Sequence, residues 1–191
     1  MRGNNSLTHR RDNFGGHTVN ITVEAVPIEQ KSVLRNLLEL YAYDFTEFIP
    51  DDVNCYGLYG YKYLDYYWTE EGRHPFIIYI DGNIAGFILI RRYYVSELND
   101  YTYSIAEFFI MKKYRKQGVG RKVAFQIFDM FPGIWEVAEV EENRPAQAFW
   151  RKVIHTFTQG KFDEIHKEGW NGPVQRFNSL KHTDLDVDGS N

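Results

Sequence analysis

The chain has 191 residues, of which 43% are hydrophobic and 25% are charged, and its formal net charge is −4. This length suits one ordinary domain, and the composition excludes a disordered chain. No apolar run is long enough to cross a bilayer, and the acidic balance argues against nucleic acid as the main partner. The single cysteine cannot form an intrachain disulfide, which is typical of a cytoplasmic protein.

The two ends of the chain lack apolar periodicity. Residues 1–19 are rich in Asn, Arg, Gly and His and contain no apolar stretch of the kind found in a secretory signal, so they predict a flexible leader or tail. Residues 183–191 are polar and acidic and are predicted to be flexible as well. A single domain is therefore expected over residues 20–182.

The first half of this domain begins with a β-branched strand, continues with an amphipathic helix and a Tyr-rich loop, and ends in a hairpin. The hairpin is the clearest local signal, because two apolar runs flank the tight turn Asp81-Gly82. Its predicted elements are, in chain order, strand 21–26, helix 29–45, loop 51–72 with a short helix over 63–70, and strands 76–80 and 84–91.

The second half alternates strands and helices around two glycine-containing breaks. Its predicted elements are strand 103–111, helix 123–131, strand 134–140, helix 144–157 with Pro145 in the first turn, and strands 162–166 and 175–180. The order β-α-α-β-β-β-α-β-α-β-β predicts an α/β fold with a mixed, mostly antiparallel sheet of about six or seven strands flanked by helices.

A basic, glycine-containing segment joins strand 103–111 to the helix after it. It reads Arg115-Lys116-Gln117-Gly118-Val119-Gly120-Arg121-Lys122. Glycines let the backbone approach a bulky ligand, and the unpaired N–H groups and dipole of a helix N-terminus favour an anion. The spacing fits neither a Walker A loop nor the dinucleotide fingerprint. The segment therefore predicts a site for a different diphosphate ligand.

The segment resembles the Arg/Gln-x-x-Gly-x-Gly/Ala motif of the GNAT acetyltransferases, a family that binds acetyl-CoA. A second stretch, residues 143–150, resembles the family's Asn-x-x-Ala-x-x-Phe/Leu-Tyr motif. The likeness covers roughly residues 20–180 and is strongest over 76–157. It implies an acetyl-CoA-dependent N-acetyltransferase with the GNAT-like fold, in which the sheet splays open between strands 105–111 and 134–140 to admit the cofactor.

The resemblance also implies which residues hold acetyl-CoA. The backbone of Phe109, Ile110 and Met111 is expected to meet the pantetheine amides as an added strand would. The N–H groups of Gln117 to Lys122 are expected to hold the pyrophosphate. Asn143 is expected to touch the pantetheine arm, with Ala146 and Phe149 packing beside it.

Acetyl transfer to an alkylammonium needs a base, because the amine has a pKa of roughly 10.4. Glu107, at the centre of strand 103–111, is the first candidate, since several family members carry a carboxylate near this point. Glu139 and Glu141 are the alternatives. Many members also use a tyrosine on the last long helix as general acid. Here Trp150 occupies that position, and an indole cannot act as such an acid, so the sequence leaves the acid unassigned.

The first two helices and their loop usually hold the acceptor in this fold. Here carboxylates and aromatic rings alternate, which suits a cationic amine through ion pairing and cation–π contact. The residues expected to bind the acceptor are Tyr41, Asp44, Asp65 and Tyr66. A small polyamine-like or aminoglycoside-like amine is the expected class, attacking directly in a ternary complex, and a peptide N-terminus is the next.

Two other functional classes compete with this interpretation. A non-catalytic acyl-CoA-binding sensor or interaction module is compatible with the missing tyrosine. Nucleic-acid binding through residues 112–122 is disfavoured by the acidic remainder of the chain. No metal is expected, since no His, Cys and Asp cluster has ligand spacing. No membrane partner is expected either, and a homodimer is compatible with the sequence without being required by it.

Overall fold

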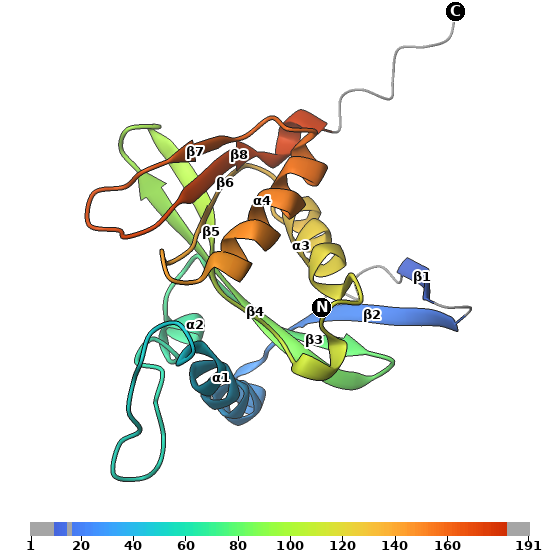
Figure 1. Ribbon diagram of the computed structural model, residues 1–191, viewed down its shortest axis with the longest axis vertical. Helices are drawn as coiled ribbons and strands as arrows, with labels where there is room; N and C mark the ends of the chain where they lie inside the picture. The colour runs from blue at the N-terminus through green and yellow to red at the C-terminus, as the bar shows by residue number, and fades with distance from the viewer. Residues whose placement is uncertain (1–9, 15–16, 183–191) are drawn as a thin grey trace, which may run out of the picture. The chain divides into compact units, whose positions relative to one another are not determined.

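The computed structural model describes residues 10–14 and 17–182 (Figure 1). The predicted flexible segment 183–191 lies outside the described residues, as do residues 1–9 and 15–16 of the predicted leader. The strands are β1 (Arg10–Phe14), β2 (His17–Ala25), β3 (Arg73–Ile80), β4 (Asn83–Val95), β5 (Asp100–Ile110), β6 (Ile134–Ala138), β7 (Asp163–Ile165) and β8 (Val174–Asn178). The α-helices are α1 (Lys31–Phe45), α2 (Tyr66–Thr69), α3 (Val119–Met130) and α4 (Arg144–Thr158).

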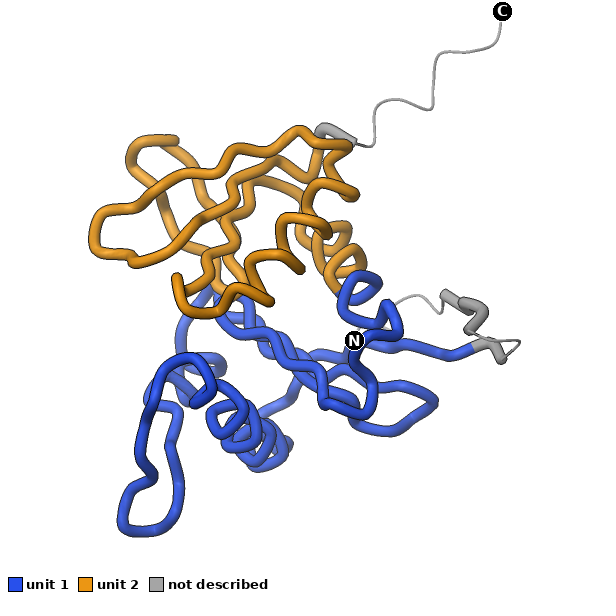
Figure 2. Tube along the Cα trace, viewed as in Figure 1, with its two compact units in different colours: residues 1–90, 106–123 blue, residues 91–105, 124–191 orange. Residues whose placement is uncertain are grey.

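The chain divides into two compact units (Figure 2). The first comprises Met1–Ile90 and Ala106–Val123, and the second comprises Arg91–Ile105 and Ala124–Asn191. Strands β4 and β5 each contribute one segment to either unit. Among the described residues, the strand order is β1-β2-β3-β4-β5 in the first unit and β4-β5-β6-β8-β7 in the second.

The sheet is mixed and mostly antiparallel, as the sequence predicts. Strand β2 pairs antiparallel with both β1 and β3, and β8 pairs antiparallel with both β6 and β7. The pairing of β5 with β6 is parallel, and its register covers three residue pairs, from Thr102↔Ile134 to Ser104↔Glu136. Beyond Glu136, strand β6 continues to Ala138 in its pairing with β8.

The core of the first unit forms between α1 and the central strands. Leu34, Leu37 and Leu38 recur at helical spacing and make the buried face of α1. They pack with Phe87 of β4 and Phe109 of β5 in one continuous apolar cluster. This cluster fixes which side of α1 faces the sheet, and residues one turn further along the same face inherit that orientation.

Aromatic rings dominate the core of the second unit. Trp135 of β6 is fully buried and lies 5.0 Å from Phe128 and 5.3 Å from Tyr103, measured between ring centroids. Phe128 of α3 also contacts Phe177 of β8, at 4.9 Å. These ring pairs hold α3 against the strands of this unit. Many of the aromatic side chains of this unit therefore serve packing.

Most predicted elements are confirmed, with shifted ends. The Asp81-Gly82 hairpin turn is present, with φ of +50° and +76° at its two residues. Helix α3 begins at Val119, four residues before the predicted start, because Gly118 takes a left-handed conformation and the helix follows at once. Strands β1 and β2 also reach into residues 10–14 and 17–19, where the sequence predicts no element.

The predicted second helix over residues 63–70 is reduced to the four residues of α2. The reason is visible in its backbone hydrogen bonds. Leu64 donates to the Tyr61 carbonyl, and Tyr67 donates to the Leu64 carbonyl, which are contacts between residues three apart. This pattern winds the chain more tightly than an α-helix does, and such runs stay short.

Gly86 is the point of closest approach between β4 and β5 in the first unit. A Cβ atom at this position would lie 1.9 Å from the Phe109 carbonyl oxygen. Just beyond it, the Met111 N–H donates to the Ala85 carbonyl at 2.8 Å. Only glycine fits here without moving a backbone that also carries Glu107.

We therefore expect Gly86→Ala to destabilise the fold by about 1–3 kcal/mol, the usual cost of overpacking. In a thermal melt each kcal/mol lowers Tm by about 2–4 °C for a chain of this size. Gly82→Asn is the matched control, because a Cβ atom at Gly82 would meet nothing within 4 Å and Asn tolerates positive φ. Equal melting temperatures for Gly86→Ala and the wild type would contradict the argument.

Candidate active site

The carboxylate of Glu107 lies at the centre of the first unit's polar chemistry. Its Oε2 accepts a hydrogen bond from the Tyr41 hydroxyl at 2.6 Å, and its Oε1 accepts one from the Tyr61 hydroxyl at 3.1 Å. The three residues come from β5, α1 and the segment between α1 and α2. Both oxygens therefore receive donors, which favours the ionised form of the carboxyl.

Tyr41 reaches Glu107 because it continues the buried face of α1. It lies four residues after Leu37 and three after Leu38, so it projects from the same side of the helix. Its ring contacts Phe87 at 5.7 Å and Phe109 at 5.9 Å. Burial and the neighbouring Glu107 raise the pKa of Tyr41 well above its usual range, so this hydroxyl keeps its proton.

Tyr61 is positioned by a contact that the sequence does not reveal. Glu39, on α1, accepts hydrogen bonds from the backbone N–H groups of Tyr59, at 2.7 Å, and Gly60, at 3.0 Å. This contact holds the loop against the helix just before Tyr61 turns toward Glu107. Burial, followed by the charge of Glu107, raises the pKa of Tyr61 far above its usual range.

Asp44 is bound to the start of the basic segment. Its Oδ2 lies 2.5 Å from Arg115 Nη2, and its Oδ1 lies 3.1 Å from Lys112 Nζ. Burial raises the pKa of the Asp44 carboxyl, but the hydrogen bonds from Arg115 and Lys112 outweigh burial and hold the pKa below its usual range. Asp44 therefore connects α1 to the basic segment, a role that the sequence does not suggest for it.

Arg115 makes two further contacts within the same unit. Its Nε donates to the Ile110 carbonyl at 2.6 Å, and its guanidinium lies 5.5 Å from the Phe109 ring centroid. The Met111 N–H is also engaged, through Ala85. Two backbone groups at the end of β5 thus have partners inside the unit, although the resemblance expects this stretch to meet the pantetheine amides.

The basic segment at residues 115–122, or glycine segment, has the geometry of an anion site. Lys116 and Gly118 both take left-handed conformations, with φ of +60° and +76°, and α3 begins directly after them at Val119. Alternating left-handed residues before a helix N-terminus turn consecutive N–H groups toward one point. The Gln117 side chain folds back and donates to the Lys113 carbonyl at 2.8 Å. The donors and cations present here fit a diphosphate.

The remaining predicted acceptor residues lie on the surface of the first unit. Asp65 pairs with Lys31 at 2.5 Å, and its side chain is 70% exposed. Tyr66 is exposed, and the Arg73 guanidinium lies 5.7 Å from its ring centroid. The two tyrosine hydrogen bonds to Glu107 therefore involve neither of these residues.

The predicted cofactor residues of the second unit form the start of α4. Asn143 is the N-cap of this helix, and its side-chain oxygen accepts a hydrogen bond from the Ala146 N–H at 3.0 Å. The ring of Phe149 lies 5.0 Å from that of Trp150. Trp150 itself is buried in the core of the second unit, 6.4 Å from Phe128. The position where many GNAT members carry tyrosine therefore serves packing here.

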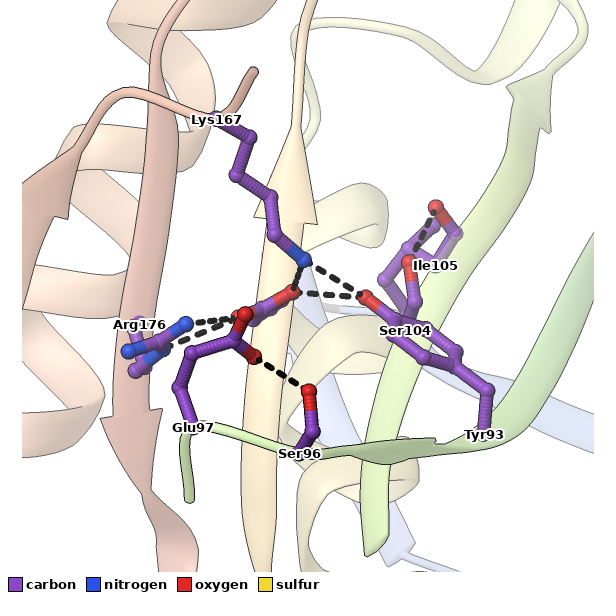
Figure 3. Close-up of polar contacts among 8 residues, drawn as sticks. Tyr93, Ser96, Glu97, Ser104, Ile105, Lys167 and Arg176 are labelled. Atoms are coloured by element: carbon purple, nitrogen blue, oxygen red, sulfur yellow. Dashed lines mark hydrogen bonds and ion pairs between the residues drawn. The ribbon is translucent and has the colours of Figure 1, made fainter. Parts of the chain in front are cut away.

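A charged cluster in the second unit escapes sequence analysis (Figure 3). Glu136 is 1% exposed, and its carboxylate accepts hydrogen bonds from Arg176, Lys167 and Tyr93. Burial raises the pKa of Glu136, but these hydrogen bonds outweigh burial and lower the pKa below its usual range. In the sequence, the signal for this cluster is a single Glu inside the otherwise apolar strand 134–138. The cluster joins β4, β6, β8 and the segment after β7, and ion pairs with Lys167 and Arg176 offset the charge of Glu136.

The two alternative bases have different environments. Glu141 pairs with Arg144 on the surface, three residues away. Glu139 is 5% exposed, and burial raises its pKa to about 8, with Gln175 and Arg151 opposing the shift only in part. Glu139 is therefore mostly protonated at neutral pH, whereas Glu107 is hydrogen-bonded in the manner of a carboxylate.

A family model, "Acetyltransferase (GNAT) family", matches residues 36–155, more than half of the chain. The chain therefore belongs to the GNAT acetyltransferases, whose co-substrate is acetyl-CoA, and the predicted family, fold class and cofactor are confirmed. No curated protein sequence matches the chain.

Solved acetyltransferase structures share the fold at low sequence identity. An acetyltransferase from Thermus thermophilus is 15% identical with a TM-score of 0.62, over 83% of this chain and 96% of that one. The protein yncA from Salmonella typhimurium, with its cofactor acetyl-CoA, is 14% identical with a TM-score of 0.56, over 88% and 99%. An aminoglycoside acetyltransferase from an uncultured soil metagenomic sample, in complex with trehalose, is 15% identical with a TM-score of 0.54, over 77% and 93%.

The described residues offer neither a membrane-spanning helix nor a metal-binding cluster. In residues 10–14 and 17–182, no helix is both long and apolar enough to cross a membrane. Within the same part of the chain, no group of three or more His, Cys, Asp and Glu side chains is arranged to hold a metal ion.

Glu139 makes the stability of the fold depend on pH. Because its pKa is raised from 4.5 to about 8 by folding, the folded state holds a proton that the unfolded chain loses, and this contribution to stability falls as pH rises between those values. We expect Glu139→Gln, which cannot lose the proton, to gain about 1–3 kcal/mol relative to the wild type between pH 5 and pH 8.

Urea unfolding of both proteins at a series of pH values measures this difference. Glu168→Gln, a change at an exposed glutamate of the same unit, is the control and is expected to follow the wild type. A difference between Glu139→Gln and the wild type that stays constant with pH would rule out the buried proton.

Proposed function

We propose that this protein is an N-acetyltransferase that moves the acetyl group of acetyl-CoA to a primary amine of a small, cationic acceptor. The observation that carries the proposal is the Glu107 carboxylate, held by two tyrosine hydroxyls in the same unit as the glycine segment. Glu107 takes the proton of the acceptor ammonium, directly or through one water. The freed amine then attacks the thioester carbonyl in a ternary complex, and CoA leaves as the thiol.

The cofactor residues are proposed on the family resemblance and on local geometry. The left-handed residues Lys116 and Gly118 support a pyrophosphate site on the N–H groups of Gln117 to Lys122. Phe109, Ile110 and Met111 remain the proposed strand contacts to pantetheine. Asn143, Ala146 and Phe149 remain proposed pantetheine contacts of the second unit. The cytoplasm is the proposed location, which the single, exposed Cys55 supports.

A cationic acceptor is supported by the rings and carboxylates around α2. The Lys62 ammonium lies 4.7 Å from the Tyr63 ring centroid, and Arg73 lies over Tyr66, so these rings already attract cations. The Asp65 carboxylate is exposed enough for an acceptor ammonium to compete with Lys31. The structural likeness to an aminoglycoside acetyltransferase agrees with this class of acceptor.

Release of free thiol from acetyl-CoA against a panel of polyamines, aminoglycosides, amino acids and short peptides tests the function. We expect acceptor-dependent release, and we expect Glu107→Gln to lower kcat by about 10²–10⁴-fold because the general base is lost. Glu29→Gln, at an exposed position of the same unit, is the control and should keep the wild-type rate.

Two outcomes would count against the proposal. Full activity in Glu107→Gln would remove Glu107 as the base. Binding of acetyl-CoA with no acceptor-dependent release would favour the acyl-CoA sensor, an alternative that has one observation behind it, the buried Trp150 at the position of the usual tyrosine acid.

Asp44 offers a test of how the glycine segment is held. Its ion pairs with Arg115 and Lys112 give it a structural task, so Asp44→Asn is expected to raise the KM for acetyl-CoA about 3–10-fold, as the loss of about 1 kcal/mol implies. The KM for the amine is expected to change less. Asp65→Asn is the comparison variant, since Asp65 is the exposed member of the proposed acceptor set. A rise in the amine KM alone for Asp44→Asn would place Asp44 in the acceptor site instead.

A further inference from the structure

Tyr41 and Tyr61 approach Glu107 from two independent parts of the first unit. The Tyr41 hydroxyl donates to Oε2 from α1, and the Tyr61 hydroxyl donates to Oε1 from the segment that Glu39 anchors. Each oxygen of one carboxylate thus has its own phenolic donor. An acceptor contact would leave the Tyr41 hydroxyl facing the substrate, whereas here it faces the base.

We propose that Tyr41 and Tyr61 are positioning residues, which together fix the orientation of the Glu107 carboxylate and keep it ionised for proton transfer. This inference rests on the proposed function of Glu107 and deepens it. It also assigns Tyr41 a role other than the acceptor contact expected from the sequence.

Two donors on two oxygens restrict the carboxylate more than one donor can. Partial rotation about the last side-chain bond of Glu107 would break both hydrogen bonds at once, because the two carboxylate oxygens accept one each. The Tyr41 ring is itself held by Phe87 and Phe109, at 5.7 and 5.9 Å. The base is therefore oriented before any acceptor binds, which is the arrangement that efficient proton transfer requires.

The tyrosines remain donors at any pH at which the enzyme would work. Burial and the charge of Glu107 raise the pKa of both Tyr41 and Tyr61. A third hydroxyl, that of Tyr67 from α2, is also buried, and burial and the Glu107 charge raise its pKa, while Arg73 of β3 opposes the shift. Tyr41, Tyr61 and Tyr67 thus keep their protons beside Glu107.

Removal of either hydroxyl tests the inference. In Tyr41→Phe and Tyr61→Phe the ring stays and one donor is lost, so the acid limb of the pH profile of kcat/KM is expected to move upward by about one to two pH units for each donor. The KM for acetyl-CoA is expected to stay unchanged. Tyr79→Phe is the matched control, because Tyr79 packs on the same apolar cluster while burial and Glu24, rather than Glu107, raise the pKa of its hydroxyl.

A measurement that needs no turnover separates this inference from the proposed function. The ¹³C NMR titration of the glutamate carboxyls, with the Glu107 signal assigned through Glu107→Gln, gives the midpoint of Glu107 directly. If no amine supports thiol release but this midpoint rises in both Phe variants, the proposed function fails and the positioning role stands. If turnover is present but neither the midpoint nor the acid limb moves, the positioning role is overturned and the function stands.

A different pattern would return Tyr41 to the acceptor site. An amine KM raised equally at every pH in Tyr41→Phe, with an unmoved acid limb, would overturn the positioning role of Tyr41. Thermal melts check that the variants are folded. Should Tyr41→Phe fail to fold, Tyr61→Phe alone decides the question, because Tyr61 is only half-buried and lies outside the helix.

Discussion

A carboxylate among aromatic rings must be hydrogen-bonded to remain ionised, and this requirement organises the first unit. Glu107 lies on β5, two residues before Phe109, which belongs to the apolar core. Water alone therefore does not fully solvate the Glu107 carboxylate. The donors come from α1 through Tyr41 and from the following segment through Tyr61. These two hydrogen bonds therefore join α1, the segment that follows it and β5 at the proposed base.

Three other carboxylates of this chain show how surroundings separate chemical roles. Asp44 and Glu136 are both paired with two cations, which lowers their pKa and makes them structural anchors. Glu139 is buried, and Gln175 and Arg151 offset the effect of burial only in part, so its pKa rises instead. Glu107 differs from these three, because two tyrosine hydroxyls donate to its carboxylate.

Local patterns in the sequence predict the features that depend on nearby residues. The Asp81-Gly82 turn and helix α4 with Pro145 both follow from such patterns. The contact between Tyr61 and Glu107, 46 residues apart, does not, because tertiary packing decides which of many tyrosines reaches the base. For the same reason, the sequence does not predict the pairing of Asp44 with Arg115, 71 residues away.

The contact between Glu39 and the loop separates the position of the loop from the identity of its side chains. Glu39 binds the main-chain N–H groups of Tyr59 and Gly60, so this anchor does not depend on the side chains that the loop carries. Residues 46–58 can therefore be exchanged for others without loss of the anchor, while Tyr61 keeps its path to the base. The side chains of this stretch can in this way diverge while the hydrogen bond from Tyr61 to Glu107 is retained.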